Sequence, residues 1–238
     1  MAVKFFSPNN PFGALAGWEL QTGANPSETE QRAAALGEDG DEIAWKGYGK
    51  DAALSCTFVA TAASGYLTLP DAGAVVGGAH IDSISVAYNQ EGFPIMTVNG
   101  HKHIDGTGHT TPCRRYRASV KLPAKAIGCP RLIECVSPST AKAFMLTPAA
   151  KIDVRGMTYT LGCTHVDEKN AEGGHLAGDN YDGVETLSVE LTGEADPTEF
   201  AVDSAWHLGT DGRNNSNTTA TTSSLALEHH VAHTPVTP

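Results

Sequence analysis

Alternating polar and apolar residues in two neighbouring stretches, residues 80–88 and 95–99, limit what this chain can fold into. In the first stretch Ile84, Val86 and Tyr88 alternate with small residues, so the apolar side chains share one face of an extended strand. The residues between the two stretches include Asn-Gln-Glu-Gly at 89–92, which is typical of a turn. The pattern therefore predicts a β-hairpin at the centre of the chain.

Most of the chain after residue 52 shows similar short apolar alternations separated by turn residues. The predicted fold class is mainly β, as a β-sandwich or an incomplete barrel. The stretch 166–183 is polar and rich in glycine and is expected to be a long loop, residues 123–128 are compatible with one helical turn, and the composition of 209–224 is typical of disorder. Strands besides the central hairpin are expected at 54–62, 66–69, 113–122, 131–136, 143–146, 151–154, 157–164, 186–192, 200–208 and 225–231.

One short α-helix is predicted between Ser27 and Gly37. Ser27 and Glu30 have the spacing of a capping box, the following alanines are strong helix formers, and glycine often ends a helix. The acidic stretch 38–42 follows. It has no known spacing of calcium ligands, so a solvated turn is the preferred interpretation.

Three segments of different character divide the chain. Residues 1–24 carry Phe5, Phe6, Phe12 and Trp18 without a clear period, which predicts an extended arm. Exposed aromatic side chains of this kind must be buried on the arm's own domain or on a neighbouring subunit, and we predict subunit contacts for the three phenylalanines. A single β-rich domain is expected at 25–232, followed by a C-terminal tail at 233–238.

Charge is distributed unevenly along the chain, which has a net charge of −11. Residues 167–238 hold 13 acidic and 2 basic residues, whereas residues 105–155 hold 9 basic and 3 acidic residues. The acidic balance argues against tight binding to DNA or RNA. Arg115, Arg117 and Lys121 would share one face of the strand predicted at 113–122, and we expect this basic face to contact an acidic face of a neighbouring subunit.

Cysteine content and the absence of targeting patterns suggest where the chain is made. The five cysteines include no Cys-x-x-Cys pair and are interpreted as reduced thiols. The first six residues lack the features of a secretion signal, and no run of about 18 apolar residues is present. We therefore expect synthesis in a cytoplasm and no contact with a membrane.

His101-x-His103-x-Asp105 at the end of the central hairpin is the sharpest chemical signal. Histidines two apart on an extended strand point to the same side, so both imidazoles could reach one metal ion, with Asp105 as a further ligand. The pattern resembles the His-x-His-x-Asp-His motif of metallo-β-lactamase-like hydrolases, but Gly106 stands in the place of the last histidine. His165 and His175 are candidate distant ligands. The alternative, which we prefer from the sequence, is a solvated hairpin end with no metal.

Other catalytic motifs are absent from the sequence. It contains no Gly-x-Ser-x-Gly, no phosphate-binding Gly-x-x-x-x-Gly-Lys and no Gly-x-Gly-x-x-Gly between a strand and a helix. We therefore expect no catalytic residues and no cofactor.

The combination of a short capped helix, many alternating strands, a central hairpin, an N-terminal arm and segregated charge resembles the tail-tube proteins of tailed bacteriophages. The resemblance covers residues 40–232. It implies a non-enzymatic virion protein, synthesised in the cytoplasm of a host bacterium, whose subunits form rings, typically hexameric, that stack into a tube. It further implies an electronegative lumen through which DNA passes without sticking, and contacts with other virion proteins. Alternatives are a capsid decoration or head-completion protein, and a metal-dependent hydrolase that uses His101, His103 and Asp105.

Overall fold

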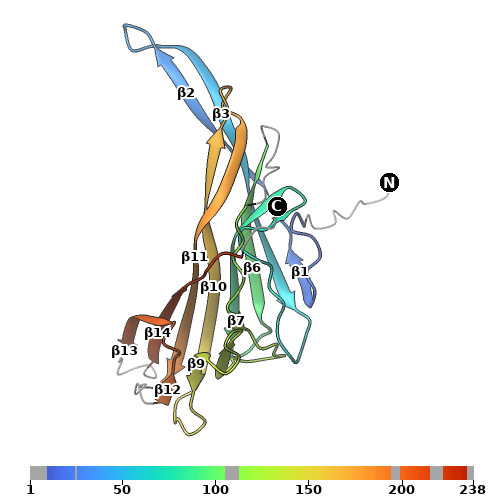
Figure 1. The fold of residues 1–238 in the computed structure, drawn as a ribbon, viewed down its shortest axis with the longest axis vertical. Helices are drawn as coiled ribbons and strands as arrows, with labels where there is room; N and C mark the ends of the chain where they lie inside the picture. The colour runs from blue at the N-terminus through green and yellow to red at the C-terminus, as the bar shows by residue number, and fades with distance from the viewer. Residues whose placement is uncertain (1–9, 25, 105–112, 194–198, 215–221, 235–238) are drawn as a thin grey trace, which may run out of the picture.

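Antiparallel β-strands make up most of the protein in the computed structural model (Figure 1). The structure describes residues 10–24, 26–104, 113–193, 199–214 and 222–234. Its strands are, in chain order, β1 (Trp18–Thr22), β2 (Ser27–Leu36), β3 (Glu42–Ala60), β4 (Val75–Val76), β5 (Ala79–Asn89), β6 (Ile95–His103), β7 (Val120–Lys121), β8 (Leu132–Cys135), β9 (Lys142–Leu146), β10 (Val154–Lys169), β11 (His175–Thr192), β12 (Phe200–Ala201), β13 (His207–Asn214) and β14 (Thr222–His230).

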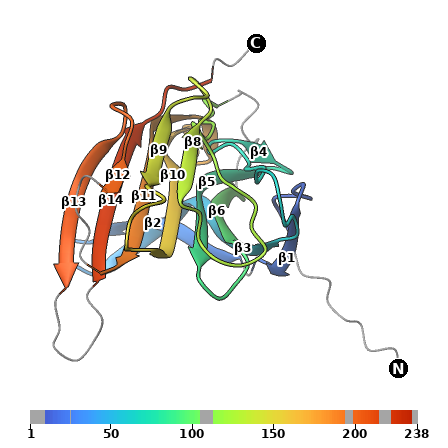
Figure 2. The ribbon, with the colours of Figure 1, turned by 90° about the horizontal axis from the view of Figure 1, so that it is seen from below.

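The strands form two sheets that lie one over the other, as Figure 2 shows. The larger sheet has the order β1-β3-β6-β5-β10-β11-β14-β13, with β2 paired to β3 and β4 paired to β5. The smaller sheet has the order β12-β9-β8-β7. Since β1 and β13 end the larger sheet without pairing to each other, the sheets are not closed into a barrel. The predicted mainly β, sandwich-like fold is confirmed.

Buried side chains from the two sheets belong to a single hydrophobic cluster. Val86 and Tyr159 of the larger sheet and Ile133 and Phe144 of the smaller sheet are all fully buried in it. The central hairpin forms as predicted from β5 and β6, and its alternating apolar side chains are buried. Burial of this apolar face fixes the register, because a slip of one residue would turn these side chains to the solvent.

The helix predicted between Ser27 and Gly37 is wrong, because these residues form β2 and pair with β3 from Ser27 opposite Ala53 to Leu36 opposite Glu42. The capping box and the alanines favour a helix only locally, and an isolated helix of two to three turns is marginal in water. Pairing with β3 supplies a ladder of hydrogen bonds along one edge of β2 instead. No α-helix occurs in the described residues.

The long loop predicted at 166–183 is also wrong, because these residues continue β10 and β11 as a hairpin. Asn170 shapes its turn by accepting hydrogen bonds from the backbone of Glu172 and Gly174. The hairpin extends beyond the hydrophobic core, so its strands need no apolar face and their sequence does not alternate. The stretch 209–224 lies partly in β13 and β14, with residues 215–221 outside the described part.

The strand predicted at 113–122 is reduced to β7 and two isolated bridges, Arg115 to Thr234 and Tyr116 to Ala72. The predicted alternation of burial nevertheless holds, since Tyr116, Val120 and Leu122 are buried whereas Arg115 and Arg117 are exposed. Residues 66–69 contribute only one bridge, between Tyr66 and Pro123, and residues 126–128 form bends rather than a helical turn.

The described end of the N-terminal segment packs on its own subunit. Phe12 is buried in the hydrophobic core, and Trp18 begins β1 and donates an indole hydrogen bond of 2.7 Å to the carbonyl oxygen of Thr68. Phe12 therefore stabilises the subunit rather than facing a partner, which corrects the predicted subunit contact. Phe5 and Phe6 lie outside the described residues.

The five cysteines are free thiols, in agreement with the prediction, and four of them are buried. No helix in the described part of the chain is both long and apolar enough to cross a membrane.

The hairpin of β2 and β3 extends away from the body of the molecule, as the upper part of Figure 1 shows. We call residues 31–48 the projecting ribbon. The tip of the β10–β11 hairpin contacts its base, through a backbone hydrogen bond from Gly49 to Gly173 and a bond from Lys169 Nζ to Gln31 Oε1. Every residue of β2 is exposed, so the ribbon contributes nothing to the core.

Candidate metal centre

Five histidines gather where the projecting ribbon meets the body of the larger sheet. The pairing of β5 with β6 sets His80 opposite His101, and the pairing of β3 with β6 sets Asp51 opposite His103. On the far side of β5, β10 pairs with β5 only as far as Gly162 and then continues beyond the start of β5. The side chains of His165 and His175 from the β10–β11 hairpin therefore reach His101 and His103 of β6.

The imidazole rings lie close to one another. His80 stacks on His101 with ring centroids 4.9 Å apart and an angle of 8° between the rings. His165 lies 4.7 Å from His101 and 4.9 Å from His80, and His103 lies 3.7 Å from His175. The five rings thus form one continuous group, which we call the histidine cluster (His80, His101, His103, His165 and His175).

Three carboxylates and one amide surround the histidine cluster. Asp82 holds His101 through Nδ1 at 2.8 Å from both of its oxygens. Asp51 lies 2.6 Å from His103 Nδ1 and 3.0 Å from His175 Nε2. Asp167 lies 2.8 Å from His165 Nε2, and Asn180 Oδ1 lies 2.7 Å from His165 Nδ1. These partners fix the orientations of the rings.

Charge and burial act in opposite directions on the groups at the centre of the cluster. Burial lowers the pKa of His103, but hydrogen bonds to Asp167 and Asp51 outweigh it, so the pKa lies above its ordinary value. Burial likewise lowers the pKa of His165, and its hydrogen bonds to Asp167 and Asn180 reverse the effect. Burial raises the pKa of Asp167, yet the bonds from both histidines bring that pKa well below its usual range. The carboxylates thus stabilise positive charge at this place.

Three groups in the cluster have the composition and spacing of metal ligands. They are His80, His101 and His165; Asp51, His103 and His175; and His103, His165 and Asp167, with the ligand atoms of each group within 4.8 Å of one another. Imidazole nitrogens and carboxylate oxygens are the ligands of zinc and related transition metals.

The sequence motif predicted part of this site. His101 and His103 do point to the same side, and the distant candidates His165 and His175 do join them, but the histidines are not the solvated hairpin end that we preferred, since their side chains are 17% and 4% exposed. Asp105 lies outside the described residues. Sequence reasoning missed His80, although the predicted hairpin already sets it beside His101.

Gly100 allows the strands of the cluster to approach closely. A Cβ atom at this position would lie 1.9 Å from the carbonyl oxygen of His80 and 3.0 Å from the ring of Phe12. Only a residue without a side chain fits between β5 and the buried N-terminal segment here.

A second buried polar group, Glu185 of β11, lies between the two sheets. Its carboxylate accepts hydrogen bonds from the backbone N–H of Ser119 at 2.5 Å, from the hydroxyl group of Ser119 and from the hydroxyl of Tyr159 at 2.6 Å. His229 Nδ1 lies 3.0 Å away. Since Ser119 precedes β7 and the other residues belong to the larger sheet, this network ties the two sheets together.

The basic residues predicted to contact a neighbour lie near the smaller sheet. Arg117 forms an ion pair of 3.2 Å with Asp71, and Lys121 Nζ lies 5.8 Å from the centre of the Tyr66 ring. Arg115 is exposed. Part of this positive charge is therefore balanced within the subunit.

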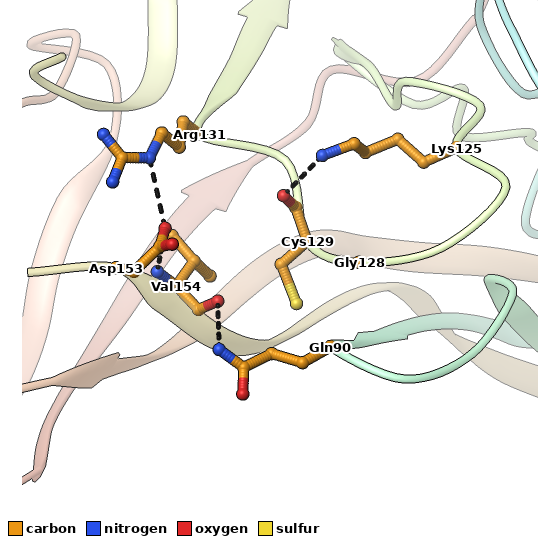
Figure 3. A pocket seen from close by; sticks show the side chains of 7 residues that line it. All are labelled: Gln90, Lys125, Gly128, Cys129, Arg131, Asp153 and Val154. Carbon is orange, nitrogen blue, oxygen red and sulfur yellow. Dashed lines mark hydrogen bonds and ion pairs between the residues drawn. The ribbon is translucent and has the colours of Figure 1, made fainter.

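A polar pocket lies at the end of the body opposite the projecting ribbon, and Figure 3 shows its lining. Arg131 pairs with Asp153 at 3.1 Å, and Lys125 donates a hydrogen bond to the carbonyl oxygen of Cys129. Burial raises the pKa of the Cys129 thiol, so this cysteine is protonated at neutral pH and lacks the reactivity of a catalytic nucleophile.

We find no match to the chain among models of protein families, and no curated protein has a significantly similar sequence.

Proposed function

We propose that this protein is a non-enzymatic structural subunit that assembles with copies of itself, as a tail-tube subunit of a bacteriophage virion does. The observation that carries the proposal is the projecting ribbon, which exposes large apolar side chains on a structure that has no core of its own. Leu36, Ile43 and Trp45 are 64%, 70% and 61% exposed.

A two-stranded ribbon is marginally stable in water unless its side chains pack on something else. Arg32 partly covers Trp45, with its guanidinium 4.9 Å from the ring centre, but Leu36 and Ile43 remain open to solvent. Contiguous exposed apolar groups on a projecting segment are typical of a protein–protein contact. Burial of the ribbon on a partner would remove this apolar surface from water.

A second copy of the same chain offers a complementary surface. The strand β3 runs from the projecting ribbon to Ala60, and its far end pairs with the start of β6, so the turn that holds Phe93 lies at the opposite end of the molecule. Phe93 and Ile127 are exposed. This end also carries basic residues, of which Arg131 and Arg155 are paired with Asp153 and Glu190 of the same subunit. Lys125 lies at the same end, beside Arg131. The turn of the ribbon at 38–42 holds four acidic residues.

Contact between opposite ends of successive copies is a heterologous, head-to-tail interaction, which extends into a stack instead of closing as a dimer. Such stacking is what a tube of rings requires, and it agrees with the resemblance described above. Arg115, Arg117 and Lys121 remain our candidates for contacts within a ring. The surplus acidic residues would keep DNA from adhering to a lumen.

The hydrolase alternative has less support from the geometry. His80 and His175 are each only 2% exposed, which leaves little room for a substrate beside the cluster. A capsid decoration or head-completion protein would also assemble with neighbours.

The test replaces residues 33–46 by Asn-Gly, which joins Arg32 to Gly47 through a tight turn. These two residues already face each other across the ribbon, so the remaining hairpin keeps its register. We expect the wild-type protein to form rings or tubes in negative-stain electron microscopy, and the shortened protein to remain a folded monomer by circular dichroism and size-exclusion chromatography with light scattering.

A pair of point variants separates loss of the contact from loss of the hairpin. Ile43→Lys combined with Trp45→Lys should abolish assembly, whereas Leu208→Lys, at a similarly exposed apolar position on β13, should preserve it. A wild-type protein that stays monomeric at high concentration, or a shortened protein that assembles normally, would overturn the proposal.

A further inference from the structure

We propose that the histidine cluster binds a divalent transition-metal ion of the zinc class, with His80, His101 and His165 as its protein ligands. The three residues come from β5, β6 and β10 respectively. An ion at this place would hold β5, β6 and β10 together near the base of the projecting ribbon. The inference does not depend on the proposed function.

The hydrogen bonds of His101 involve Nδ1 and leave Nε2 available to bind a metal. Nδ1 faces both oxygens of Asp82 at 2.8 Å and so carries a hydrogen that it donates to the carboxylate. In the neutral ring Nε2 then carries the lone pair. Nε2 is buried and has no hydrogen-bond partner among the residues that the structure describes. A carboxylate that holds the other nitrogen of a histidine is the usual surrounding of a zinc ligand.

Asn180 fixes the ring nitrogen of His165 that carries the hydrogen, as Asp82 does for His101. The amide nitrogen of Asn180 donates to the carbonyl oxygens of Gly73 at 3.3 Å and Arg114 at 2.8 Å, so its oxygen faces the histidine as an acceptor. His165 Nδ1, 2.7 Å from that oxygen, is therefore the donor, and Nε2 is the nitrogen that can bind a metal. Asp167 lies 2.8 Å from Nε2 and accepts its hydrogen bond, so a metal on Nε2 would displace that hydrogen and leave the carboxylate beside the ion.

The spacing fits a small ion after modest movement. The ligand atoms of His80, His101 and His165 lie within 4.8 Å of one another. Around a tetrahedral zinc ion with bonds of about 2.0–2.1 Å, ligand atoms are roughly 3.3 Å apart. The rings of His80 and His101 are nearly parallel, so rotation of these imidazoles out of their stack would bring both lone pairs onto the ion and replace the ring contact with metal–ligand bonds.

The ion's role is structural rather than catalytic. Three ligands from three neighbouring strands would fix β5, β6 and β10 to one another. The ion would lie just beyond the point where the pairing of β10 with β5 ends, at Gly162 opposite Ser83. Because His80 and the rings around it are buried, exchange of ligands with a substrate is restricted.

The first test is metal content. The full chain without a purification tag is dialysed against metal-free buffer, and bound metal is measured by inductively coupled plasma mass spectrometry. We expect about one zinc per chain in the wild type, and Co²⁺ added to the chelated protein should give the visible absorption of a tetrahedral site. Less than about a tenth of an equivalent of zinc, together with no visible spectrum after addition of Co²⁺, would overturn the proposal.

Variants then test which residues hold the ion. His101→Ala and His165→Ala should each lose the bound metal, whereas His230→Ala, an exposed histidine of β14, should retain it. Asp82→Asn should keep the ion but weaken its binding by about 10- to 100-fold, as expected for a residue that orients a ligand. Should a variant fold poorly, competition of the wild-type protein with a zinc indicator still measures the affinity.

The neighbouring group provides the sharpest contrast. His175→Asn removes a ligand from the group of Asp51, His103 and His175 and should leave zinc stoichiometry unchanged. Loss of metal in this variant together with its retention in His101→Ala would overturn the assignment of the ligands.

Discussion

Replacing Tyr159 with Phe isolates one hydrogen bond inside the sandwich. The hydroxyl of this fully buried residue donates to Glu185 Oε1 at 2.6 Å, and the phenylalanine ring fills the same space without it. A hydrogen bond to a charged acceptor contributes about 1.5–3 kcal/mol, and its loss leaves the buried carboxylate with one donor fewer. We expect the free energy of unfolding to fall by about 2 kcal/mol, which corresponds to a decrease in Tm of roughly 4–8 °C for a chain of this size.

Urea denaturation followed by circular dichroism measures the change, and the slope with denaturant should stay constant. A double-mutant cycle with Glu185→Gln should give a coupling of about 1 kcal/mol or more, since the two residues are in direct contact. The matched control is Tyr66→Phe, which breaks a hydrogen bond of 2.8 Å to Glu134 on the surface and should leave the stability unchanged. A loss below about 0.5 kcal/mol for Tyr159→Phe, or additive effects in the cycle, would refute the contribution of this hydrogen bond to the buried network.

Three further predictions concern the core. Burial and the charge of Glu185 raise the pKa of Tyr159 well above 10.0, so the folded protein keeps this proton while the unfolded chain loses it. The contribution of this tyrosine to the free energy of unfolding is fully present below pH 10. Above pH 10 the free energy of unfolding should decrease by up to about 1.4 kcal/mol per pH unit because of this residue. Urea titrations of the wild type and Tyr159→Phe over this pH range would reveal a flatter pH dependence in the variant. Phe12→Ala should cost about 3–5 kcal/mol by thermal denaturation, because it opens a cavity in the subunit's own core, and an unchanged Tm would restore the view that the N-terminal segment serves a partner. Gly100→Ala should destabilise the protein by about 2–3 kcal/mol and increase hydrogen exchange along β5 and β6. Gly209→Ala in β13 should have little effect, because the added Cβ would meet only the carbonyl oxygen of Ala226, at 3.5 Å. Equal destabilisation by the two substitutions would contradict the close approach of Gly100 to His80.

The sequence predicted strands best where one face is buried. The central hairpin and the segments near Thr186–Thr192 and Leu225–Val231 follow their alternation because each has an apolar face against the core. All of β2 lacks such a face, so local helix propensity was the stronger signal there and it was misleading. The first half of β3 lacks one too, and no strand was predicted there. Polar hairpins outside a core cannot be recognised from periodicity, since nothing selects their apolar positions.

The histidine cluster depended on pairing between distant strands. The spacing of His101 and His103 predicted two imidazoles on one side of β6, but their neighbours come from strands whose order in the sheet the sequence does not reveal. His80 was within reach of prediction, because the hairpin register places it opposite His101. Asp167 lies in a hairpin that was expected to be a loop, so its approach could not be foreseen. His175 lies in the same hairpin and was predicted as a distant ligand from its residue type alone.

The projecting ribbon pairs only with itself beyond its base, which makes its length independent of the rest of the fold. Adding one residue to each strand would reverse which side chains face each way, whereas adding two preserves the faces and lengthens the ribbon by about 6.8 Å. Such insertions would leave the hydrophobic core, the histidine cluster and the inter-sheet network unchanged. In an assembly built on this contact, the length of the ribbon would therefore determine the repeat distance between successive copies. That distance would change in increments that correspond to two residues in each strand.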